Sequence, residues 1–167
     1  MADENKGTAL ADVGQAEGPQ LRVLTQYIKD LSFENPNSPR LLGGLDTAPA
    51  IEVQINVNVQ RMSESDYEVV LAIRAEAKVK EEVMFLVELQ YAGLFRLTGI
   101  PADNLEAVLL IECPRQIFPF ARRIVADATR DGGFPPLMVD PIDFVGLYQQ
   151  RKSQIQGVGE PDTSRPN

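Results

Sequence analysis

The feature that most constrains the fold is a strict alternation of apolar and polar residues over positions 51–59. Every odd-numbered residue in this stretch is apolar, and every even-numbered residue is polar. Because successive side chains of a β-strand point to opposite sides, this pattern predicts a strand with one buried and one solvated face. Such a strand needs neighbours to pair with and a second layer to cover its apolar side.

Three further strands are expected beside it. A polar turn at 62–66 leads into a second strand over about 67–79, and a charged turn at 80–82 leads into a third over about 83–95. An earlier, less regular strand is expected over 21–33. Turns this short join antiparallel neighbours. The first half of the chain therefore predicts a four-stranded antiparallel sheet.

The same period-2 pattern predicts which side chains share a face of the sheet. The residues assigned to the solvated face are Ile28, Asp30, Ser32 and Glu34 with Met84, Leu86, Glu88 and Gln90, and those assigned to the buried face are Val23, Tyr27, Leu31 and Phe33 with Val83, Phe85, Val87, Leu89 and Tyr91. Carboxylates beside an exposed leucine suit the docking of a basic partner. An ordinary solvated face would have the same composition.

The second half of the chain is predicted to be helical. A helix is expected over about 104–112 with Asp103 as its cap, and a second, which begins with a proline, over about 114–130. A last helix is expected over about 142–151, capped by Asp140. Strands followed by helices indicate an α+β fold, with the helices packed on one face of the sheet.

Three regions follow from these patterns. Residues 1–20 are polar and small and are expected to form a disordered tail. The folded domain is expected over 21–150. Residues 151–167 contain glycine and proline but no aromatic residue, and they predict a flexible C-terminal tail.

The composition excludes several classes of function. The chain has no histidine and a single cysteine, Cys113, so it has no Ser-His-Asp or Cys-His pair, no intrachain disulfide and no ordinary zinc site. No nucleotide-binding motif occurs. A net charge of −8 disfavours nucleic acids and anionic membranes and favours a basic protein partner. With no signal peptide and no membrane-spanning stretch, we expect an intracellular, non-enzymatic protein without cofactor or metal.

Apolar residues also occur in segments that one core cannot bury completely. They are Leu41, Leu42 and Leu45 after the first strand, Phe118, Phe120 and Phe134 in and after the long helix, and Phe144 and Tyr148 in the last helix. Such side chains could line a groove for apolar peptide, form a subunit interface or make a second layer of the core.

Five segments, taken in order, resemble the SecB family of export chaperones. The segments are YIKDLSFENPN at 27–37, DYEVVL at 66–71, FLVELQYAGLF at 85–95, CPRQIFPFAR at 113–122 and GGFPPL at 132–137. The first and fourth are the most specific, because they are long and unusual in composition. The resemblance extends over about residues 21–149.

The resemblance implies a cytoplasmic homotetramer, built as a dimer of dimers, that binds unfolded preproteins and delivers them to the SecA motor ATPase. By position, it implies a motor-docking set of Asp30, Glu34, Leu86 and Glu88 and a dimer–dimer interface at Val87, Leu89 and Tyr91. It also implies apolar client grooves, for which the candidates among the apolar residues named above are Leu41, Leu42, Phe118, Phe120, Phe134, Phe144 and Tyr148.

Two other functions remain open from the sequence. One keeps the SecB-like fold but assigns it to a chaperone of a toxin–antitoxin system, which would bind one small partner instead of many preproteins. The other is a small-ligand-binding or enzymatic α+β protein with a cleft beneath the segment that joins the first two strands. The lack of histidine disfavours the second, because histidine is the commonest acid–base group.

Overall fold

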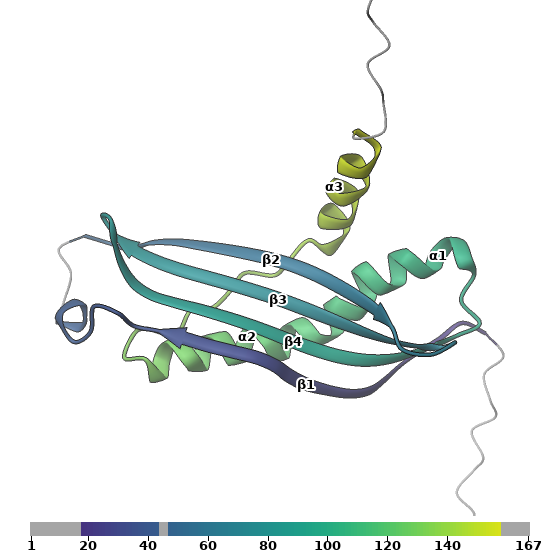
Figure 1. The fold of residues 1–167 in the computed structure, drawn as a ribbon, viewed down its shortest axis with the longest axis horizontal. Coiled ribbons are helices and arrows are strands. Elements are labelled where there is room, and N and C mark those ends of the chain that lie inside the picture. Colours follow the sequence, from purple (N-terminus) through teal and green to yellow (C-terminus); the bar gives the residue numbers. More distant parts are fainter. Residues whose placement is uncertain (1–17, 44–46, 158–167) are drawn as a thin grey trace, which may run out of the picture.

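One layer of the molecule is an antiparallel sheet with the strand order β1-β4-β3-β2, and the helix α2 lies along one face of it (Figure 1). The computed structural model describes residues 18–43 and 47–157. The strands are β1 (Gln20–Glu34), β2 (Ala50–Arg61), β3 (Asp66–Val79) and β4 (Glu82–Thr98). The predicted α+β fold with a four-stranded antiparallel sheet is confirmed.

The helical layer is more continuous than the sequence predicts. Helix α1 (Ala102–Ala107), the π-helical turn η2 (Val108–Glu112) and α2 (Cys113–Asp131) follow one another without a gap. Pro114 lies in the first turn of α2, where a missing N–H is tolerated, and the wider turn η2 precedes it. Asp103 lies in the first turn of α1 but makes no capping hydrogen bond, so its predicted role as a cap is wrong.

The last helix, α3 (Phe144–Gly157), begins and ends later than predicted. Its cap is Asp143 and not Asp140, because the backbone N–H of Gly146 donates to Asp143 Oδ1 at 3.0 Å. The helix continues beyond Arg151, through residues assigned to the flexible tail. The rest of that predicted tail, 158–167, and most of the predicted N-terminal tail, 1–17, lie outside the described residues. A short 3-10 helix, η1 (Arg40–Leu42), follows β1.

The core lies between the sheet and α2. On the inner face, Leu71, Val87 and Leu89 are at most 1% exposed, and on the facing side of α2, Ile117 and Val125 are fully buried. Each such side chain contributes about 1.5–3 kcal/mol of hydrophobic free energy relative to an exposed position. The alternation in the sequence thus assigned the buried face of β4 correctly over most of its length.

Strand β1 departs from simple alternation at two bulges. Its register against β4 shifts between Val23 and Thr25, and again between Ile28 and Asp30. A bulge adds one residue to one strand and reverses which residues point inward beyond it. Ile28 therefore lies opposite Tyr91 on the inner face, and Tyr27 lies on the outer face. The sequence had assigned both residues to the opposite faces.

A third shift between β3 and β4 corrects another prediction. Ala77 pairs with Phe85, but Lys78 pairs with Val83, so Met84 is the extra residue. Met84 was expected on the solvated face, yet it is only 5% exposed and belongs to the core. None of the described helices combines the length and apolar character needed to cross a bilayer.

Candidate functional site

The four residues of the predicted docking set lie together on the outer face of the sheet, opposite α2. Asp30 and Glu34 project from β1, and Leu86 and Glu88 project from the neighbouring strand β4. In the register, Glu34 faces Leu86 directly, while Glu88 faces Ser32, two residues along β1 from Glu34. Neighbouring strands are about 4.8 Å apart, so the carboxylates and the leucine form one small surface. We call these four residues the docking surface.

The carboxylates of the docking surface differ in their surroundings. Glu88 accepts a long contact of 3.5 Å from Arg74, on the next strand, β3. Arg74 also contacts Glu76 at 3.6 Å. Within the described chain, Asp30 and Glu34 have no ion-pair partner. The sequence did not predict that Arg74 pairs with Glu88, because the bulge at Met84 moves β4 by one residue relative to the register that the short turn would give.

A second polar cluster on the outer face joins β1 to β3. The carboxylate of Glu68, whose side chain is 8% exposed, accepts a hydrogen bond from Lys29 Nζ at 2.7 Å and another from the Tyr27 hydroxyl. Both hydrogen bonds lower the pKa of Glu68, and the bond from Lys29 has the larger effect. The bond to Glu68 is likewise the main cause that raises the pKa of Tyr27 to about 12. Lys29 is the extra residue of the second bulge of β1, so the cluster links this bulge to β3 across β4.

The predicted groove residues divide into two groups. Four belong to the core and are at most 8% exposed, and three are accessible from solvent. The core members are Leu41, Phe118, Phe134 and Phe144, and the accessible members are Leu42, Phe120 and Tyr148. Leu45 lies outside the described residues.

The core members pack against one another and against the sheet. The ring of Phe134 lies 5.1 Å from that of Phe85, and the ring of Phe118 lies edge-on to that of Phe144 at 6.2 Å. Phe118 and Phe144 also line a hollow beside α2, but none of the four core members presents much surface. The accessible members are the ones that an apolar peptide can reach.

A hollow of about 760 Å³ lies between α2 and the segment that leads to α3. It is lined by apolar side chains from both elements and by four arginines of α2. The apolar lining includes Phe118, Pro119, Met138, Ile142 and Phe144. Met138 is 55% exposed and was not identified from the sequence, since a lone methionine among prolines carries no periodic signal.

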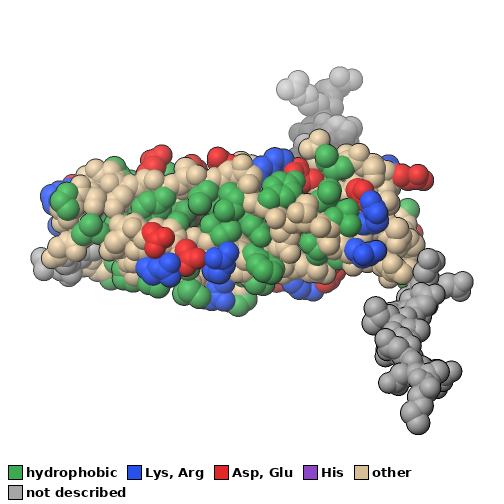
Figure 2. Space-filling view, turned by 90° about the horizontal axis from the view of Figure 1, so that it is seen from below, with side chains coloured by type: hydrophobic (Ala, Val, Ile, Leu, Met, Phe, Trp, Pro, Cys, Tyr) green, Lys and Arg blue, Asp and Glu red, His purple; other side chains and the backbone are tan. Residues whose placement is uncertain are grey.

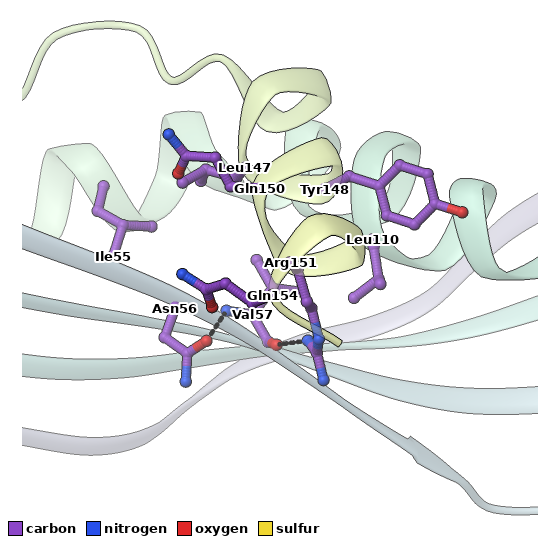
Figure 3. Close-up of a pocket in the computed structure, with 9 residues that line it drawn as sticks. All are labelled: Ile55, Asn56, Val57, Leu110, Leu147, Tyr148, Gln150, Arg151 and Gln154. Carbon is purple, nitrogen blue, oxygen red and sulfur yellow. Dashed lines mark hydrogen bonds between the residues drawn. The ribbon is translucent and has the colours of Figure 1, made fainter. Parts of the chain in front are cut away.

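A second hollow, of about 310 Å³, lies between the edge strand β2 and α3 (Figure 3). Tyr148 and Leu147 reach it from α3, and Leu110 reaches it from η2. Arg151 Nη1 donates to the Val57 carbonyl at 3.1 Å, which ties α3 to the free edge of β2. On the side of the molecule seen from below in Figure 2, apolar side chains gather along the middle, with charged side chains beside them.

The three predicted interface residues are buried within the single chain. Val87, Leu89 and Tyr91 are 0%, 1% and 8% exposed and lie on the inner face of β4, which α2 covers. A partner subunit cannot touch them directly in this arrangement.

Among the described residues, no three of the His, Cys, Asp or Glu side chains cluster in a way that could hold a metal ion. Cys113 is buried, and burial is the main cause that raises the pKa of its thiol to about 12. Such a thiol is not ionised at neutral pH and is a poor nucleophile. The apolar hollows and the charged outer face therefore carry the recognisable chemistry of this part of the chain.

Comparison with known proteins gives one consistent result. The family described as "Preprotein translocase subunit SecB" matches residues 14–155. The chain is 64% identical over 157 residues to the protein-export protein SecB of Parvibaculum lavamentivorans, covering 92% of this chain and 94% of that one. It is 51% identical to the protein of the same name from Afipia carboxidovorans, covering 96% and 98%.

Among the solved structures that share the fold is a SecB-like chaperone of Mycobacterium tuberculosis in complex with a peptide from an antitoxin, with a TM-score of 0.61. The match covers 73% of this chain and 90% of the other, at 13% identity. At that identity the likeness supports the fold alone.

Proposed function

The chain belongs to the SecB family of protein-export chaperones, and we propose that it performs this function with two separate surfaces. Unfolded preproteins bind the apolar hollows on the side that carries the helices. The SecA motor binds the docking surface on the outer face of the sheet. The single observation that carries this proposal is that α2 and the docking surface lie on opposite sides of one sheet.

Client binding is proposed to be passive and to use many weak contacts. Leu42, Phe120 and Tyr148, together with Met138, offer apolar surface to an extended chain, while the core members of the groove support them from beneath. Linking several weak sites along one client raises the overall affinity without sequence specificity. Binding of the unfolded state then opposes folding and aggregation by mass action, with no need for a nucleotide.

Motor docking is proposed to depend on charge complementarity. Asp30, Glu34 and Glu88 offer three carboxylates around Leu86, which suits a basic segment that carries one apolar side chain. The net charge of −8 adds a long-range attraction for such a segment. Asp30 and Glu34 are the members of the set that have no competing cation in the described chain.

The proposed working form is a cytoplasmic homotetramer, a dimer of dimers. Support comes from β1, an edge strand that leaves Leu24, Ile28 and Leu31 between 39% and 48% exposed. Apolar side chains on an open edge favour association with another copy. Val87, Leu89 and Tyr91 would stabilise the contact between dimers indirectly, by holding α2 in position.

The proposal is tested by native mass spectrometry and a holding assay on the same preparation. We expect four copies per particle, and suppression of the aggregation of an unfolded preprotein without added nucleotide. A monomer that leaves aggregation unchanged would contradict the proposal. Capture of a single small partner in place of many preproteins would point instead to a chaperone of a toxin–antitoxin system.

A further inference from the structure

Arg74 stands in the middle of the outer face, next to the docking surface. It projects from β3, an inner strand, and its backbone pairs directly with Glu88 on one side and with Gln54 on the other. A partner that covers Leu86 and Glu88 therefore has to contact Arg74 or move it. The proposed function does not assign any role to this cation.

The contacts of Arg74 are longer than those of Lys29 and Arg96, two other cations on the outer face. Lys29 lies 2.7 Å from Glu68, and Arg96 binds Asp66 through two hydrogen bonds of 2.7 and 2.9 Å. By contrast, Arg74 approaches Glu88 only to 3.5 Å and Glu76 to 3.6 Å, and Lys78 lies closer to Glu76, at 3.3 Å. Contacts of this length are weak hydrogen bonds at best.

The carboxylate that Arg74 contacts is also accessible. The side chain of Glu88 is 48% exposed, and that of Arg74 is 36% exposed. A solvent-exposed ion pair of this kind contributes little to stability and exchanges partners at little cost. Arg74 is thus positioned as a weak occupant of a site that an external cation can take over.

We propose that Arg74 is a specificity-determining residue of the docking surface: it occupies Glu88 from within the chain, and the basic segment of the motor must displace it. This inference rests on the proposed docking function of the outer face. A segment with one or two positive charges is repelled by Arg74 and can form ion pairs only with Asp30 and Glu34. A densely basic segment supplies enough charge to replace Arg74 at Glu88 as well.

The test is the affinity of purified SecA for the full-length chain, measured by isothermal titration calorimetry at an ionic strength of about 0.15 M. Arg74→Gln removes the internal cation and should tighten binding about two- to fivefold, the factor that corresponds to loss of one exposed ion pair. Arg22→Gln is the matched control. It removes the same charge from the same face. Arg22 pairs with Arg96, which lies eight residues along β4 from Glu88, a distance of about 27 Å. Arg22→Gln should therefore leave the affinity unchanged.

A double-mutant cycle separates displacement from a general change in charge. In a Glu88→Gln background, the gain from Arg74→Gln should shrink, because the main carboxylate that it releases is absent. An equal gain in both backgrounds would overturn the specific role of Glu88. No gain, or a loss, from Arg74→Gln in the parent chain would overturn the inference as a whole.

Two further variants distinguish a failure of the proposed docking function from a failure of the proposed role of Arg74. Glu34 makes no contact with Arg74, so Glu34→Gln should weaken SecA binding whether or not Arg74 competes. If Glu34→Gln and Glu88→Gln both leave SecA binding unchanged, the docking function itself is wrong. If both weaken binding while Arg74→Gln has no effect, the docking function holds and only the role of Arg74 is wrong.

Discussion

The two faces of the sheet are stabilised in different ways. On the inner face, Ile73 and Leu89 are 1% exposed and are held by close packing against neighbouring side chains. On the outer face, side chains are held by ion pairs, some short, such as that between Lys29 and Glu68, and some long, such as that between Arg74 and Glu88. The inner face therefore resists any change of shape, whereas the outer face can exchange its partners.

Because of this difference, the inner face of the sheet determines stability and the outer face is available for recognition. A packed interior loses stability whenever a buried side chain is shortened, because the surrounding residues fill the cavity only in part. A solvated ion pair can be broken and remade with little effect on folding. Substitutions on the inner face should therefore act on stability first, and substitutions at the docking surface should act on affinity alone.

The largest effect is expected from a cavity on the inner face. Ile73→Ala should lower the free energy of unfolding by about 2–5 kcal/mol, because it leaves a void at the centre of the core. Urea denaturation at a fixed protomer concentration measures this loss. Gln90→Ala, on the outer face of β4, is the control and should change stability by less than about 0.5 kcal/mol. Similar losses for both variants would remove the distinction between the two faces.

The next largest loss of stability is expected from Gly93→Ala, which tests how closely α2 approaches the sheet. A Cβ atom at Gly93 would lie 2.5 Å from Cε2 of Phe95 and 3.0 Å from Cγ2 of Ile117, on α2. Gly93→Ala should therefore lower the free energy of unfolding by about 1–3 kcal/mol through overpacking. Gly18→Ala, where an added Cβ meets nothing within 4 Å, is the matched control. A neutral Gly93→Ala would mean that α2 packs less tightly on β4 than described.

The smallest stability effect is expected at the Glu68 cluster, and it depends on pH. Folding lowers the pKa of Glu68 below its ordinary value of 4.5, because Lys29 and then Tyr27 donate hydrogen bonds to the carboxylate. This contribution is complete above pH 4.5 and is lost as the pH falls through the lower value of the folded state. Glu68→Gln should cost about 1 kcal/mol at neutral pH, because the charge is lost while the amide oxygen can still accept a hydrogen bond.

The pH dependence gives the sharper readout for this variant. Urea denaturation at a series of acidic pH values should show less loss of stability in Glu68→Gln than in the parent chain, because the group that takes up the proton is gone. Glu64→Gln, in the exposed turn between β2 and β3, should retain the parent profile. A parent-like profile for Glu68→Gln would mean that this carboxylate is not stabilised by the cluster.

Much of the fold is predictable from local patterns, and the exceptions have a common cause. Alternation identified the strands, and the spacing of apolar residues identified α2. The bulges at Leu24, Lys29 and Met84 were not predicted, because an extra residue in a strand leaves no mark on composition. Each bulge changes which face a residue occupies, and this accounts for the errors at Tyr27, Ile28 and Met84.

The candidate site was predictable to a similar extent. The docking surface could be placed on one face because Asp30, Glu34, Leu86 and Glu88 lie beyond the bulges in a regular register. Arg74 could not be paired with Glu88 without knowing the shift at Met84. The groove was harder to predict, because an aromatic residue in an irregular segment can be either core or surface, and Phe134 proved to be core.

Motor and client are expected to bind separate surfaces, and Glu88→Lys tests this separation most directly when both functions are measured on one preparation. Reversing this charge should weaken SecA binding by about tenfold or more, since a like charge then faces the basic partner. Suppression of preprotein aggregation should remain at the parent level. Equal loss of motor binding and client holding in Glu88→Lys would contradict the account.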